Sequence, residues 1–168
     1  MKTSNAKFLN KLTLITAVAV AAGTGISAQA GTDTTTMGLT TEVVANCTIS
    51  AAALNVSGYD PIEANKTTDF DQTSTVTVAC TKDTSAEVTF DQGNNTDRRL
   101  KDSLNNLLDY ELYKDTARGE VWGDTATFGK TITGTGLQVG HTVYIRVPAG
   151  QNVPAGTYND TVQATVTF

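Results

Sequence analysis

The chain has 168 residues, of which 39% are hydrophobic and 17% are charged, and its formal net charge is −5. This acidic balance disfavours nucleic acid and anionic membrane surfaces as partners. With one histidine and two cysteines, the chain also has too few soft ligands for a zinc site.

The first thirty residues have the pattern of an export signal. Three lysines precede an apolar run from Leu12 to Ala22, and Ala28-Gln29-Ala30 supplies small residues for cleavage before Gly31. The alternative is a membrane anchor, but a span needs roughly 20 apolar residues and this run is shorter. We therefore expect residues 1–30 to be a signal peptide and expect no membrane insertion. The exported part then has a net charge of −8, because three of the 12 basic residues and none of the 17 acidic residues precede Gly31.

The two cysteines, Cys47 and Cys80, both lie in the part that we expect to be exported. In an oxidising compartment an even pair indicates a disulfide, and two cysteines allow one pairing. Closing a loop of about 34 residues stabilises a fold by roughly 3.5–4 kcal/mol in the chain-entropy model. The alternatives, a redox pair or a metal site, are weaker because no Cys-x-x-Cys spacing occurs.

From residue 43 onward, short stretches alternate between apolar and polar residues and are broken by Gly, Asn, Asp and Pro. Such a pattern predicts an antiparallel all-β domain of about six or seven strands, and with the early disulfide it favours an immunoglobulin-like sandwich. Between the strands, Arg98 to Asn106 is expected to hold one short helical turn. The expected inward sets are Val43, Ala45, Cys47 and Ile49; Val76, Val78 and Cys80; Ala86, Val88 and Phe90; Leu108, Tyr110 and Leu112; Val143, Ile145 and Val147; and Val162, Ala164, Val166 and Phe168.

A further alternating stretch lies ahead of the first cysteine. In extended conformation it places Met37, Leu39, Thr41 and Val43 on one face. A sandwich that lacks its last strand leaves an open edge that must be covered. The stretch would cover such an edge on a neighbouring copy, which builds a filament because the contact does not close on itself. Alternation alone leaves two other readings open: a disordered tail, or a strand that pairs within its own domain.

The residues that suggest a ligand or catalytic site are weaker signals. His141 is expected on the surface, in a turn before a strand, and no catalytic constellation accompanies it. Arg98 and Arg99 are either a partner contact or a solvated turn, and Trp122 either binds a sugar or packs over the end of the sandwich. The acidic clusters do not match calcium-loop spacing and are ordinary turn formers; they are Asp69 with Asp71, and Asp91 with Asn94, Asn95 and Asp97. We expect no enzyme activity, no cofactor and no metal.

Several motifs in order along the chain resemble one known family. They are Cys47-Thr48-Ile49-Ser50, Gly58-Tyr59-Asp60-Pro61, the VTVACTK run around Cys80, Asp97-Arg98-Arg99-Leu100, YELYK from Tyr110, Val121-Trp122-Gly123-Asp124, and the closing VPAG…VPAGTYNDTVQATVTF. The chain thus resembles the spore coat protein U family, the domain used by major pilins of archaic chaperone–usher pili. The resemblance covers nearly all of Cys47 to Phe168.

The resemblance implies an incomplete immunoglobulin-like fold that lacks its final strand. It implies that residues 31–45 are an N-terminal donor strand and residues 46–168 the pilin domain, with a Cys47–Cys80 disulfide. The donor face would be Met37, Leu39, Thr41 and Val43, and the acceptor strand would carry Val162, Ala164, Val166 and Phe168. Thr41 departs from the apolar pattern, which leaves the register open by two residues.

The function implied is that of an exported pilus subunit which polymerises by donor-strand exchange and supports surface attachment or biofilm formation. Its expected partners are further copies of itself, other pilus subunits, a periplasmic chaperone and an outer-membrane usher. Its path would lead through the periplasm to the cell surface. The alternatives are a monomeric secreted coat or matrix protein whose own N-terminal strand folds back, and a surface-binding adhesin module.

Overall fold

The computed structural model describes residues 29–54 and 58–168, so the predicted signal peptide lies outside it except for its last two residues. Residues 41–168 form one compact unit. In the described part, every regular element is a β-strand and every pairing is antiparallel, as the sequence predicts. Nine strands are assigned: β1 Cys47–Ala51, β2 Phe70–Cys80, β3 Ser85–Phe90, β4 Arg99–Lys101, β5 Leu107–Asp109, β6 Glu111–Tyr113, β7 Lys130–Thr133, β8 Gln138–Val147 and β9 Ala164–Thr167.

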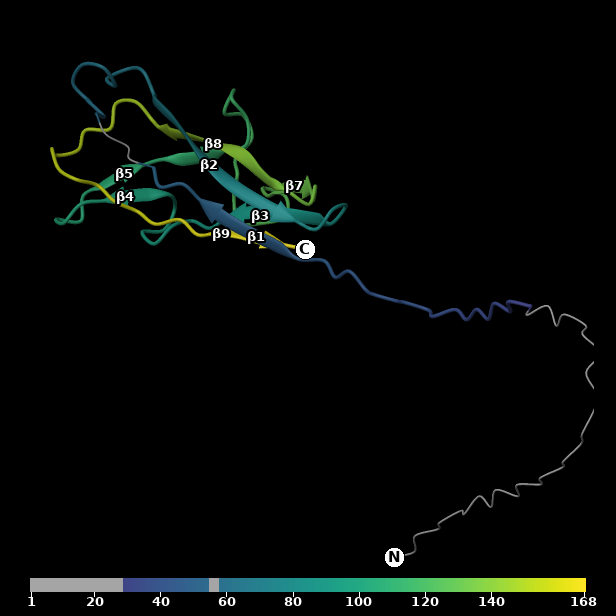
Figure 1. Cartoon of the computed structure of the whole chain (residues 1–168). Helices are drawn as coiled ribbons and strands as arrows, with labels where there is room; N and C mark the ends of the chain where they lie inside the picture. Colours follow the sequence, from purple (N-terminus) through teal and green to yellow (C-terminus); the bar gives the residue numbers. More distant parts are fainter. Residues whose placement is uncertain (1–28, 55–57) are drawn as a thin grey trace, which may run out of the picture. The chain divides into compact units, whose positions relative to one another are not determined.

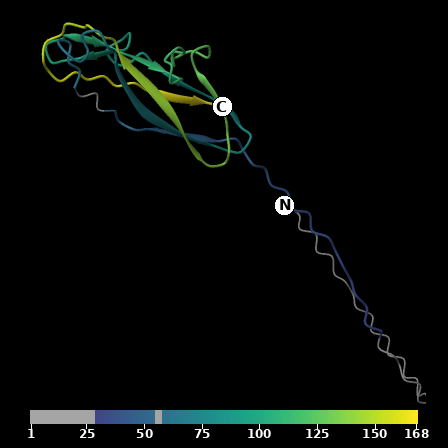
Figure 2. The same cartoon turned by 90° about the horizontal axis from the view of Figure 1, so that it is seen from above.

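The strands form two main sheets and one short hairpin (Figure 1). The larger sheet has the order β1-β2-β8-β6, and the smaller has the order β7-β3-β9. In these two sheets β1 and β9 each have one hydrogen-bonded neighbour, so both are edge strands. They lie close to each other across the gap between the sheets, and Figure 2 shows the yellow last strand ending at the C-terminus.

The core lies between the two sheets and is built from the alternating apolar residues. Val76, Val88 and Val147 have no exposed surface, and the predicted inward residues of β3 are all buried. Leu108, Tyr110 and Leu112 are buried as predicted, although they span β5, β6 and the residue between them. The alternation therefore identified most of the core correctly.

The disulfide joins Cys47 to Cys80, with the two sulfur atoms 2.02 Å apart. These residues are opposite each other at the start of β1 and the end of β2. The predicted pairing is confirmed, and it fixes the beginning of the edge strand β1 to the neighbouring strand.

Two predictions on local structure are wrong. The first strand begins at Cys47 rather than Val43, because β2 ends at Cys80 and leaves the earlier residues without a partner strand. The helical turn predicted over residues 98–106 is the β4–β5 hairpin, in which Leu100 is opposite Leu108. The Asp102 carboxylate holds its turn by accepting hydrogen bonds from the backbone N–H groups of residues 104 and 106, at 2.9 and 2.8 Å.

Candidate functional site

An apolar cavity of about 410 Å³ lies between the end of β1 and the segment that leads into β9. One wall is Ala51–Leu54 and the other is Asp160–Val162, and residues 74–76 of β2 contribute next to the first wall. We call this space the groove. It lies where β1 has ended and β9 has not yet begun, so no strand covers the core side chains beneath it. The floor is Phe90, Leu100, Tyr110, Leu112, Val143 and Ile145.

The backbone on both walls has free hydrogen-bonding groups. The Ala52 N–H donates to a carbonyl of β2 at 3.0 Å, and the Thr161 carbonyl accepts from the β3–β4 loop at 3.1 Å. Successive residues of an extended chain point their backbone groups to opposite sides. The next residues, Ala53 and Val162, make no hydrogen bond to any residue that the structure describes. Their N–H and C=O groups are therefore available to a strand that enters the groove.

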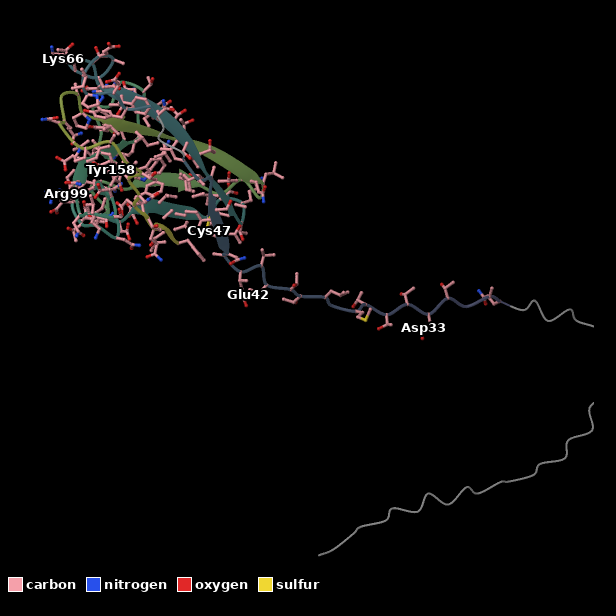
Figure 3. All side chains as sticks on the ribbon, turned by 90° about the vertical axis from the view of Figure 1, so that its left-hand side faces the viewer. Asp33, Glu42, Cys47, Lys66, Arg99 and Tyr158 are labelled. Carbon is pink, nitrogen blue, oxygen red and sulfur yellow. A yellow bond between two sulfur atoms is a disulfide. The ribbon has the colours of Figure 1, made fainter. Side chains whose placement is uncertain are left out.

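A second cavity, of about 820 Å³, continues the groove at its outer end and shares Leu54, Leu100 and Asp160 with it. Its wall is held in place by Tyr59, whose hydroxyl donates to the Pro148 carbonyl and accepts from the Gln151 N–H, both at 2.9 Å. In Figure 3 the label Cys47 marks the start of β1, and the label Tyr158 marks the segment ahead of β9. The groove thus opens toward a wider and more polar space.

The Asp160 carboxylate is the centre of a hydrogen-bond network at the edge of the groove. Its Oδ2 accepts from the Tyr110 hydroxyl at 2.7 Å. Its Oδ1 accepts from the backbone N–H of Thr161 at 2.8 Å, and from the backbone N–H and side-chain Nδ2 of Asn95 at 3.2 and 3.1 Å. The Asn95 Nδ2 also donates to the Arg99 and Asn159 carbonyls. Burial, and then the hydrogen bond to Asp160, raise the pKa of Tyr110 above its ordinary value, so the phenol stays protonated.

The predicted acceptor residues lie partly on the groove. Val162 lines it, whereas Ala164 and Val166 are half-buried in β9 and pack against the core farther along. Phe168 is 56% exposed. At this end β9 comes close to β1, so the open part of the groove is the part near Val162.

The predicted donor face is solvent-exposed. Met37, Leu39 and Val43 are 81%, 85% and 78% exposed, and Thr41 is exposed as well. No strand is assigned to residues 29–46, the stretch in which Figure 3 labels Asp33 and Glu42. The apolar side chains of the predicted donor face are therefore exposed.

The other candidate residues have structural surroundings. Trp122 has no exposed surface, packs edge to face on Phe90, and donates from Nε1 to the Val88 carbonyl at 2.7 Å. It therefore offers no ring to a sugar. Arg98 is 2% exposed, so the expected solvated turn is wrong for this residue; its guanidinium donates to the Phe90 and Trp122 carbonyls at 3.1 and 3.0 Å. Arg99 pairs with Asp109 at 3.2 Å.

His141 lies within β8 rather than in a turn, and it lines a small cavity of about 180 Å³. Burial, and then the nearby Lys130 ammonium, lower its pKa below the ordinary value.

In the acidic clusters, Asp69 and Asp71 both pair with Arg146, at 3.2 and 2.8 Å. Asp91 accepts from the backbone N–H groups of Gly93 and Gln163 at 3.0 and 2.9 Å.

Across residues 29–54 and 58–168, no His, Cys, Asp or Glu side chains gather in a group of three or more that would hold a metal ion. The same residues contain no helix that is long and apolar enough to cross a membrane. Among the described residues, the groove is therefore the strongest candidate for a functional site.

Residues 33–165 match the family model of the Spore Coat Protein U domain. Protein U of Myxococcus xanthus is 38% identical over 157 residues, which cover 84% of this chain and 88% of that protein. Among solved structures, similarity is found to a chain of the CsuC–CsuE chaperone–tip adhesion subunit pre-assembly complex, from archaic chaperone–usher Csu pili of Acinetobacter baumannii. The TM-score is 0.57 at 24% identity, over 75% of this chain and 40% of that chain. The chain therefore belongs to the Spore Coat Protein U domain family, and it shares an immunoglobulin-like fold with a chain of that pilus complex.

Proposed function

We propose that this chain is an exported structural subunit of a surface pilus and that it polymerises by donor-strand exchange. Residues 31–45 of one copy are the donor segment, and residues 46–168 of the next copy are the acceptor domain. Met37, Leu39, Thr41 and Val43 face the groove, and the inserted segment pairs first with the residues that follow β1 and with those that precede β9. Such a contact is head-to-tail and does not close on itself, so it extends into a filament.

The observation that carries the proposal is the apolar groove between two unpaired sheet edges. Its floor is core side chains, and its walls carry free backbone groups at Ala53 and Val162. Burying the side chains of Met37, Leu39 and Val43 would contribute roughly 1.5–3 kcal/mol each, before any ladder hydrogen bonds. The same three side chains are 78–85% exposed in the isolated chain. The donor segment thus has apolar side chains to bury, and the groove has an apolar floor that would bury them.

The accessory partners and the location follow from the same proposal. A subunit with an open groove needs temporary cover before assembly, since an exposed sheet edge pairs with other chains. A periplasmic chaperone would give this cover, and an outer-membrane usher would replace it with the donor segment of the next copy. The similarity to a chain from a chaperone–tip adhesion subunit complex supports this assignment. The pilus would lie on the cell surface and serve attachment or biofilm formation, a structural role with no catalysis.

The experiment compares the chain that begins at Gly31 with its Leu39→Asp variant by size-exclusion chromatography and unheated SDS gels. Leu39 is on the proposed donor face, so a carboxylate there would have to enter the apolar floor of the groove. We expect ladders of multimers for the parent chain and monomers for the variant. A chain that begins at Val44, without the donor face, should also be monomeric.

Thr40→Asp is the matched control, because it places the same charge on the opposite face of the segment. It should form the same ladders as the parent chain. A parent chain that stays monomeric, or a Leu39→Asp variant that still polymerises, contradicts donor-strand exchange.

The second candidate is a coat or matrix protein that stays monomeric. The coat role is favoured by the family that the chain matches, the Spore Coat Protein U domain. In this case the chain's own N-terminal segment would fold back into the groove. The parent chain would then be a monomer that loses thermal stability when Leu39 is changed to Asp, whereas Thr40→Asp would leave the stability unchanged.

A further inference from the structure

One pair of polar side chains at the groove, Tyr110 and Asp160, has unused hydrogen-bonding capacity. The Tyr110 hydroxyl donates its proton to Asp160 Oδ2 at 2.7 Å, and no described residue donates to the phenol oxygen in return. A phenol oxygen accepts as well as donates. The Asp160 carboxylate accepts three hydrogen bonds at Oδ1 and one at Oδ2, so Oδ2 keeps one free lone pair beside the phenol oxygen. The Tyr110–Asp160 pair therefore offers an acceptor position at the phenol oxygen and another at Asp160 Oδ2, and both residues line the groove.

The positions of these acceptors are fixed by residues far apart in the chain. The Asn95 side chain bridges Asp160 to the carbonyls of Arg99 and Asn159, at 3.0 and 2.8 Å. Gly93 leaves room for the carboxylate, because a Cβ at this residue would collide with Asp160 Oδ2. A hydrogen-bond partner held so firmly favours an incoming donor with matching geometry.

The donor face has one hydroxyl among its apolar side chains. Met37, Leu39 and Val43 are apolar, and Thr41 is the exception. A hydroxyl buried without a partner is unfavourable, so a threonine in an apolar groove needs an acceptor.

The direction of the inserted strand decides which end of the donor segment lies beside Asp160. The end of β1 lies beside the segment that leads into β9, so a strand inserted between them is antiparallel to one and parallel to the other. We place it antiparallel to β9, the pairing found for every strand of the smaller sheet. Because β9 runs from Asp160 toward Phe168, the C-terminal end of the donor then lies beside Asp160. Thr41 is near this C-terminal end, and Leu39 and Met37 follow at intervals of about 7 Å toward the end where β1 and β9 approach each other and would have to separate.

We propose that the Tyr110–Asp160 pair sets the register of assembly by accepting a hydrogen bond from the Thr41 hydroxyl of a second copy of this chain. The inference rests on the proposed function and adds a specificity-determining contact to it. It also accounts for the polar residue at a position where a larger apolar side chain would fill the groove better.

The test uses polymers of the chain that begins at Gly31, in which each interface contains Thr41 of one copy and Tyr110 of the next. The dissociation rate is measured as exchange with an excess of a fluorescent peptide of residues 31–46. Thr41→Val keeps the shape of the side chain and removes the hydroxyl, and Tyr110→Phe keeps the ring and removes the acceptor. Each should accelerate dissociation about fivefold to tenfold, the effect of one buried hydrogen bond.

The double variant decides the question, because it should dissociate no faster than either single variant. Thr40→Val, on the opposite face, should leave the rate unchanged. Independent effects that multiply in the double variant, or a Thr41→Val polymer as stable as its parent, would overturn the inference. If Tyr110→Phe fails to fold, Asp160→Asn takes its place, because an amide that donates to the phenol oxygen would occupy the acceptor position.

Failure of this inference is distinguishable from failure of the proposed function. If Leu39→Asp abolishes polymers while Thr41 and Tyr110 show no coupling, strand exchange stands and the register contact is wrong. If the parent chain forms no polymers, both are wrong.

Discussion

Removing the disulfide tests how the edge strand of the groove is held in place. Cys47 and Cys80 are 33 residues apart in sequence and join the start of β1 to the end of β2. For a closed loop of this length, the chain-entropy relation gives about 3.8 kcal/mol of stabilisation at 25 °C. Single domains typically have about 5–15 kcal/mol in total, so the loss would be a large fraction of the stability of this domain.

The assay is urea unfolding of the chain that begins at Gly31, in the Leu39→Asp background so that assembly does not contribute. We expect the Cys47→Ala/Cys80→Ala variant to lose about 3–4 kcal/mol in the free energy of unfolding. Reducing agent should lower the stability of the disulfide-bonded protein to a similar value and leave the double variant unchanged.

A loss below about 1 kcal/mol would refute the loop-closure reasoning, since that is the size of a single surface contact. The denaturant slope should be larger for the variant, because an unfolded chain without the cross-link exposes more surface.

Two further predictions concern the packing around the groove and the outer face of the larger sheet. Gly93→Ala should destabilise the domain more than Gly58→Ala in thermal unfolding. Both glycines have positive φ, at 80° and 95°, but only at Gly93 does an added Cβ meet Asp160. Equal losses of thermal stability would mean that the Asp160 hydrogen-bond network adjusts to the added methyl group without further destabilisation. The hydrogen bond from Arg146 lowers the pKa of Asp71, so this pair contributes stability above the ordinary carboxyl pKa of about 4 and loses it as the pH falls through the lowered value. Urea unfolding at pH 7 and pH 2 should therefore show a smaller difference between the parent chain and Arg146→Met at the lower pH, and a constant difference would contradict the linkage.

Sequence patterns predicted the strands whose two faces differ clearly in polarity. Val76 and Val78 of β2 and Ala86, Val88 and Phe90 of β3 are buried as expected, because one face of each strand packs on the core. Local patterns failed where a residue is defined by distant partners. Arg98 sits in a polar, turn-like stretch, yet it is buried because carbonyls of Phe90 and Trp122 accept its hydrogen bonds.

The groove itself had no signal in the local sequence. Alternation before Cys47 predicted an exposed strand-like segment, but it did not reveal which core residues remain uncovered. The network around Asp160 joins residues 65 and 50 positions away, Asn95 and Tyr110, so no motif of adjacent residues contains it. Asn and Asp in such loops are ordinary turn residues by composition.

The sequence by itself determined the strand faces, the disulfide pair and an apolar segment ahead of the domain, because each depends on spacing along one stretch of chain. Tertiary structure decided that β1 and β9 are neighbouring edges with a groove between them, and that Tyr110 and Asp160 meet beside it. The physical reason is that side-chain alternation fixes which face of a strand is buried, whereas the order of strands in a sheet depends on pairing between segments far apart in the chain.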